Sequence, residues 1–212
     1  AKLLALLNVV ACVGWSAVNA IVGGQILATA TSGELPVWEG ILLLAAITTP
    51  VAMGGYRFVH RFERFAWLPM AIIFGWTGLL AAQSWQAPPP TPVNLPAFLS
   101  FGSAIFGFAA SWSSYAADYN VRQPEDTNPR GVFWLTYVGV LIPCLLLETL
   151  GLALTLVPRL SGKMGGSLLA EALLPMGTPG QAALFVLALS VVSNNIPNDY
   201  SLGLTLQVLG RW

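Results

Sequence analysis

Long apolar stretches alternate with short polar segments along the whole chain. Residues 3–33 contain no charged side chain, and a second charge-free stretch runs from Gly40 to Tyr56. Residues 65–117 also lack charge, but they are too many for one span and are divided by three prolines at 88–90. A helix that crosses the hydrocarbon layer needs about 20 apolar residues. The pattern therefore predicts several membrane-spanning helices joined by short loops.

Six spans are predicted within a single transmembrane domain over residues 1–212, which we interpret as an excerpt of a larger membrane protein. The segment SLLAEALL at 167–174 is too short to cross, and we expect it to lie on the outer surface as an amphipathic piece. The expected spans cover residues 3–29, 37–55, 66–85, 97–117, 132–157 and 180–209.

The basic residues predict the orientation of these spans, because short loops that carry Lys and Arg stay in the cytoplasm. One set of alternating loops holds seven of the nine basic residues, and the other set holds Arg159 and Lys163. We therefore expect both ends of the chain to be cytoplasmic. The seven are Lys2, Arg57, Arg61, Arg64, Arg122, Arg130 and Arg211.

Composition agrees with a membrane protein and argues against other classes. With 56% hydrophobic and 8% charged residues, the chain lacks the polar surface of a soluble globule. Nine Lys and Arg are balanced by nine Asp and Glu without a long basic run, so no nucleic-acid partner is expected. Cys12 and Cys144 lie singly in apolar stretches and His60 is the only histidine, so we expect no disulfide, metal site or cofactor.

Polar residues in the first span lie on one helical face. Asn8, Cys12, Trp15, Asn19 and Gly23 recur at spacings of three or four residues. An indole and an amide one turn apart can stack on a flat ring and hydrogen-bond its edge. The alternative is structural, with Asn8 and Asn19 joining helices and Gly23-Gly24 forming a close-packing site.

Small polar residues in the fourth span predict a weakened helix. Gly107 and the serines at 111, 113 and 114 can compete for backbone hydrogen bonds. An unwound stretch here would direct backbone groups into a cavity, with Ser111 and Trp112 beside it. The alternative for Trp112 is a place in the aromatic belt at the membrane surface.

The last span contains three asparagines around a proline. Pro197 removes a backbone donor and is expected to leave a carbonyl near Ser193 unpaired. Asn194, Asn195 and Asn198 can satisfy such groups or bind a ligand, and polar side chains at this depth usually face a cavity or a partner.

Glu148 is the acid that we expect to be alone in the hydrocarbon. It lies in the fifth span. We expect no charged side chain among the residues that bind the ligand. A structural role as a hydrogen-bonded or protonated side chain is favoured over a proton relay.

Four motifs, taken in order, resemble the nucleobase-cation symporter family, and most closely its fungal purine-cytosine permease branch. The resemblance covers essentially the whole chain and rests on GWSAVNAIVGGQIL, SWSSYAADYNVRQP, IPCLLLETLG and SNNIPNDYSLGLTLQVLGR. The resemblance implies an all-α integral membrane protein with the inverted-repeat fold of the leucine transporter. It further implies that the six spans correspond to helices three to eight of that fold.

The same resemblance implies a binding site for a nucleobase. In this interpretation Trp15 and Trp112 sandwich the base, Asn19 binds its edge, and the last span shapes the opposite side through Asn194, Asn195, Pro197 and Asn198. Ser190 and Ser193 fall where sodium-coupled relatives carry hydroxyl ligands, whereas fungal members are typically proton-driven.

The function implied is import of cytosine and purines by cation symport, with a proton favoured as the coupling ion and the plasma membrane as the location. A vitamin B6 or other heterocycle importer of the same family is the first alternative. An intramembrane enzyme is a remote one, because we find no catalytic constellation at membrane depth.

Overall fold

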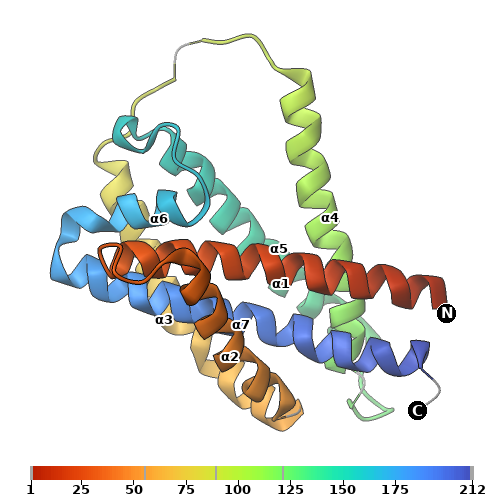
Figure 1. The fold of residues 1–212 in the computed structure, drawn as a ribbon. Helices are drawn as coiled ribbons and strands as arrows, with labels where there is room; N and C mark the ends of the chain where they lie inside the picture. The colour runs from red at the N-terminus through yellow and green to blue at the C-terminus, as the bar shows by residue number, and fades with distance from the viewer. Residues whose placement is uncertain (1, 55, 89, 121, 211–212) are drawn as a thin grey trace. The chain divides into compact units, whose positions relative to one another are not determined.

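The computed structural model describes residues 2–54, 56–88, 90–120 and 122–210 (Figure 1). Helices make up nearly all of the ordered structure, and the described residues form no strand. Residue 55, the expected end of the second span, and Arg211 lie outside the described residues. The elements are α1 (Lys2–Ala30), α2 (Val37–Met53), α3 (Tyr56–Ala82), α4 (Leu95–Asn120), α5 (Pro129–Thr155), η1 (Pro158–Leu160), α6 (Gly165–Leu173), η2 (Leu174–Met176) and α7 (Thr178–Leu209).

Five helices of the described chain are long and apolar enough to cross a membrane. They are α1, the part of α3 from Glu63 to Ala82, α4, α5 and α7. The remaining expected span, residues 37–55, corresponds to α2. This apolar helix has 17 residues, which is at the short end of the range for a crossing helix. The chain is therefore an all-helical membrane protein, and the count of six spans stays a prediction.

The chain divides into two compact units. The first contains Ala1–Gln86 and Thr149–Trp212, and the second contains Ala87–Glu148. Within the first unit, α1 and α7 lie side by side along most of their length and make its most extensive contact (Figure 1). They run antiparallel, because the Gln181 side chain donates to the Ala30 carbonyl while Asn8 reaches Thr205.

The core of the first unit fills the space between α1, α2, α6 and α7. Its buried side chains include Ile26 and Leu27 of α1, Leu44 of α2 and Ile196 of α7. Lipid tails are as apolar as these side chains, so moving them from lipid into a helix contact gains no hydrophobic free energy. Close packing therefore stabilises such contacts.

Glycines bring α1 close to its neighbours. A β-carbon at Gly23 would lie 2.5 Å from Leu44 Cδ1 and 2.9 Å from Val191 Cγ2, so a side chain does not fit there. A β-carbon at the next residue, Gly24, would likewise lie 2.7 Å from the Val37 carbonyl oxygen. The close-packing interpretation of these two glycines is therefore confirmed.

The segment SLLAEALL forms a short helix that packs against the rest of the first unit, and its place on the outer side of the membrane stays a prediction. Its residues belong to α6 and η2, and α6 packs into the core through Ala170 and Leu173. The Gly166 N–H donates to Oε1 of Gln25 at 3.0 Å, which ties the start of α6 to α1. The apolar side of this short helix packs against α1 and α7.

In the second unit, α4 is a continuous helix, so the expected unwound stretch is wrong. The hydroxyl of Ser111 donates to the Gly107 carbonyl at 2.8 Å, and the hydroxyl of Ser114 donates to the Ser111 carbonyl at 3.0 Å. Such bonds return to the preceding turn of the same helix and satisfy each serine without breaking it.

Candidate functional site

Three asparagines form a hydrogen-bonded group between α1 and α7, which we call the amide cluster: Asn19, Asn195 and Asn198. Asn19 Nδ2 donates to Asn195 Oδ1 at 2.8 Å, and Asn198 Nδ2 donates to the same oxygen at 3.3 Å. Asn195 Nδ2 in turn donates to the Ser16 backbone carbonyl at 3.2 Å. The side-chain carbonyl of Asn195 thus accepts hydrogen bonds from two amides, and the amide nitrogen of Asn195 bonds to α1.

The geometry of α7 selects which of its asparagines join the cluster. The helix continues through Pro197, and Asn195, Pro197 and Asn198 are buried whereas Asn194 is exposed. Residues three apart share a helical face, so Asn195 and Asn198 point to α1 together. The side chain of Asn198 also donates to the Asn194 backbone carbonyl at 3.5 Å. Asn194 follows Ser193, near which the sequence predicted an unpaired carbonyl.

Trp15 adjoins the amide cluster on α1. It lies four residues before Asn19, which places both on the same face one turn apart. Both side chains are partly buried. An indole beside a pre-oriented amide can stack on a flat ring while the amide bonds its edge.

Trp112 and Ser111 belong to the second unit, whereas Trp15 and the amide cluster belong to the first. On α4, Trp112 makes edge-to-face contacts with Tyr115 and Phe108, with ring centroids 5.6 Å and 6.4 Å apart. Both neighbours belong to α4 and lie three or four residues from Trp112, so the three rings share one face of the helix and pack against each other. The sandwich of Trp15 and Trp112 stays a prediction.

Asn8 takes the structural role that the sequence left open. Its Nδ2 donates to Ser201 Oγ at 3.1 Å and to Thr205 Oγ1 at 2.7 Å, so it joins α1 to α7 near the end of α7. Ser190 also has a local partner, because its hydroxyl donates to the Leu187 carbonyl at 2.6 Å. Ser193 is partly buried on the same helix.

Asp199 is the residue that sequence reasoning missed. The expectation that Glu148 is the lone acid in the hydrocarbon was wrong, because Asp199 lies inside α7 and is partly buried. It stands four residues after Asn195, inside the motif that contains the asparagines. Measuring its distance from the helix ends would have revealed it.

Glu148 lies on α5 in the second unit and is partly buried. It is seven residues from the end of α5 at Thr155, which is about 10 Å at 1.5 Å per residue. By the same measure, Asp199 is about 15 Å from Leu209 at the end of α7, close to half of a hydrocarbon layer of about 30 Å. Asp199 is therefore the deeper acid relative to its nearer helix end.

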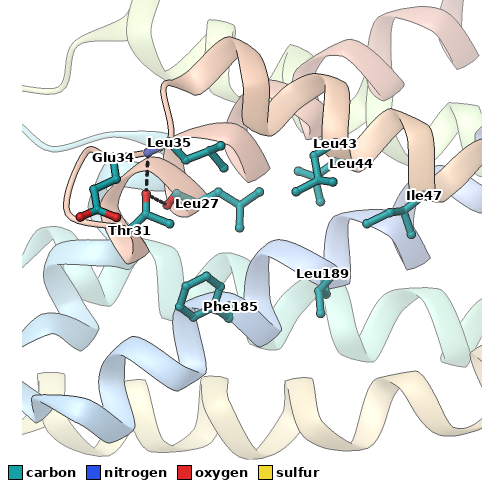
Figure 2. A pocket seen from close by; sticks show the side chains of 9 residues that line it. All are labelled: Leu27, Thr31, Glu34, Leu35, Leu43, Leu44, Ile47, Phe185 and Leu189. Carbon is teal, nitrogen blue, oxygen red and sulfur yellow. Dashed lines mark hydrogen bonds between the residues drawn. The ribbon is translucent and has the colours of Figure 1, made fainter.

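A pocket in the first unit lies apart from the amide cluster (Figure 2). Phe185 and Leu189 of α7 line it opposite Leu43 and Ile47 of α2. At one end, Thr31 accepts a hydrogen bond from the Leu35 N–H at 3.1 Å, which closes the turn between α1 and α2. The walls are mostly apolar, with Thr31 and Glu34 at one end, and they include none of the expected substrate-binding residues.

Comparison with known proteins identifies the family. The model of permeases for cytosine/purines, uracil, thiamine and allantoin matches residues 1–210. The purine-cytosine permease fcyB of Emericella nidulans is 41% identical over the whole chain, and FCY2 of Saccharomyces cerevisiae is 34% identical over 99% of it. The vitamin B6 transporter TPN1 of Saccharomyces cerevisiae is 31% identical over 98%.

The chain spans 44%, 42% and 38% of the lengths of these three relatives, so it corresponds to less than half of each. No solved structure matches it. The family match, by contrast, extends over nearly every residue. The chain therefore belongs to the family of permeases for cytosine/purines, uracil, thiamine and allantoin.

Proposed function

We propose that the full-length protein is a secondary active transporter that imports cytosine and purine nucleobases together with a cation, a proton in preference to sodium. The observation that carries the proposal is the amide cluster, in which Asn195 accepts from both Asn19 and Asn198 one turn from Trp15. A neutral base has two π-faces and an edge of donors and acceptors. Stacking contributes about 1–3 kcal/mol per base, and a bidentate amide contact discriminates by about 1–3 kcal/mol.

In this proposal each site residue has a distinct role. Trp15 and Trp112 stack on the two faces of the base, and the amide cluster reads its edge. Asn19 is suited to this role because its Nδ2 is already oriented by Asn195, which reduces the entropy lost on binding. The remaining residues shape the walls of the site: Ser111, Asn194 and Pro197.

The proposed fold is that of the leucine transporter, with α1 to α5 and α7 corresponding to helices three to eight. Support comes from the antiparallel pairing of the first and last of these helices and from prolines inside four of them. Prolines are tolerated in membrane helices whose neighbours satisfy the freed backbone groups. We place both ends of the chain in the cytoplasm and the protein in the plasma membrane.

Cation symport provides the driving force for accumulation. A membrane potential of about 100 mV supplies about 2.3 kcal/mol per charge moved. That corresponds to roughly fifty-fold accumulation for one proton per substrate, since every 1.4 kcal/mol is a factor of ten.

Vitamin B6 is the second candidate substrate, because TPN1 is 31% identical to the chain. Pyridoxine is also a flat heterocycle with polar groups on its edge, so stacking and amide contacts suit it as well. The purine-cytosine permeases FCY2 and fcyB have higher identity, which favours nucleobases.

Competition uptake with the full-length protein tests the proposal. Radiolabelled cytosine is supplied to cells that lack their own nucleobase importers, with excess adenine, guanine, hypoxanthine, uracil or pyridoxine. We expect the purines to compete and a protonophore to abolish accumulation. Competition by pyridoxine alone would assign the protein to vitamin B6 transport, and accumulation that follows a sodium gradient would reject the proton.

A further inference from the structure

Asp199 lies beside a buried hydroxyl on the neighbouring helix. Ser16 Oγ is buried and makes no hydrogen bond to the described residues. The carboxyl of Asp199 is the side chain that interacts with this hydroxyl, although the pair does not reach hydrogen-bond geometry here. A buried donor without a partner is costly, so a carboxylate beside this hydroxyl offers it an acceptor.

Among the described residues, Asp199 forms no salt bridge. The α1 face toward it carries Ser16 and the buried thiol of Cys12, and Tyr200 is its neighbour on α7. The charged residues of α3 are gathered within its first nine positions: Arg57, His60, Arg61, Glu63 and Arg64.

The acid and the amide cluster share one face of α7. Asp199 follows Asn195 by four residues, and Asn195 donates to the backbone carbonyl of Ser16, whose hydroxyl adjoins the acid. Ser16 therefore lies next to both Asn195 and Asp199. Towards the end of α7 the same interface continues with Ser201 and Thr205, both bonded to Asn8.

We propose that Asp199 is the group that carries the coupled proton, with Ser16 as the hydrogen-bond donor to its ionised form. A proton from the outer solution converts the carboxylate to the neutral acid when the base binds at the amide cluster. The same proton leaves to the cytoplasm after the base is released, which restores the carboxylate and moves one positive charge inward. A carboxylate without an ion-pair partner among the described residues is suited to this cycle, because protonation removes its charge.

The inference rests on the proposed nucleobase symport, and reconstituted full-length protein tests both. Asp199→Asn keeps the shape but cannot exchange a proton, and Glu148→Gln is the matched control on the other acid. In proteoliposomes, exchange of cytosine at equal pH on both sides measures binding and movement without coupling. An inward pH gradient of one unit then measures accumulation, which is about tenfold for one proton.

We expect Asp199→Asn to retain exchange within about threefold and its accumulation ratio to fall to about one, while Glu148→Gln accumulates normally. Accumulation by Asp199→Asn equal to that of the unmodified protein would overturn the assignment and leave nucleobase transport intact. If the unmodified protein moves no nucleobase, the proposed function and the assignment both fail.

Two further variants guard against a merely structural effect. Asp199→Glu restores a titratable group, so its cytosine affinity should again depend on pH, and a flat profile would contradict the proposal. Ser16→Ala removes the donor to the ionised form, so the midpoint of the pH profile should move to higher pH. An unchanged midpoint in Ser16→Ala would exclude Ser16 from the pair.

Discussion

Asn19 of α1 and Asn195 of α7 are 176 residues apart in the chain and are joined by a hydrogen bond of 2.8 Å. The bond orients both amides at the point where the indole of Trp15 adjoins them. Because each amide has a donor and an acceptor group, the pair is suited to the edge of a base as well as to its partner helix.

The amide cluster predicts a change in specificity. Asn19→Ser and Asn198→Ser should alter the ranking of cytosine, adenine and hypoxanthine, because each amide presents a donor and an acceptor that the bases match differently. Inhibition constants for the three bases against labelled cytosine measure this. An equal loss for all three would indicate damage to the α1–α7 contact instead.

The indoles predict an effect that is independent of the base. Trp15→Ala and Trp112→Ala should each weaken transport of every nucleobase by about 1–3 kcal/mol, since stacking does not depend on edge chemistry. Tyr or Phe at either position should restore much of the affinity. Trp38→Ala is the control, because Trp38 is exposed at the start of α2. Unchanged cytosine affinity in both alanine variants, with normal surface levels, would rule out the sandwich.

Glu148 is predicted to have a structural role. Glu148→Gln keeps a hydrogen-bond donor and the shape of the side chain, so it should reach the membrane and transport nearly normally. Glu148→Ala should reach the surface poorly, because a neighbouring helix loses a partner. Surface level, substrate binding and pH-dependent uptake are measured for both. A correctly localised Gln variant that binds substrate without accumulating it would show that Glu148 carries the proton instead.

Close packing of α1 predicts intolerance at Gly24. A β-carbon there would lie 2.7 Å from the Val37 carbonyl oxygen and 2.9 Å from Ile41 Cγ1, so Gly24→Ala should separate α1 from α2 and lower the thermal stability of the protein. Gly75→Ala is the control, since its new β-carbon would have no neighbour within 4 Å. Melting temperatures in detergent compare the two. Equal stability of the variants would show that the helices adjust without cost.

Hydrophobic patterning was enough to predict a membrane protein and the approximate places of its helices. Charge-free stretches can be measured against the thickness of a bilayer, so α1, α4, α5 and α7 were visible in the sequence. The motif around Pro197 likewise indicated the family that the comparison with known permeases then confirmed.

Which polar side chains meet was decided only by tertiary structure. Helical spacing puts Asn8 and Asn19 on one face, but it does not predict their partners. Asn8 forms a hydrogen bond with Thr205, and Asn19 forms one with Asn195. Those pairs depend on the antiparallel register of α1 and α7, which close packing at Gly23 against Val191 helps to set. In the same way, the serines of α4 bond within their own helix, because a continuous helix satisfies them locally at no loss of backbone hydrogen bonds. The sequence thus determined which groups are polar at membrane depth, and the packing of α1 on α7 determined which of them became partners.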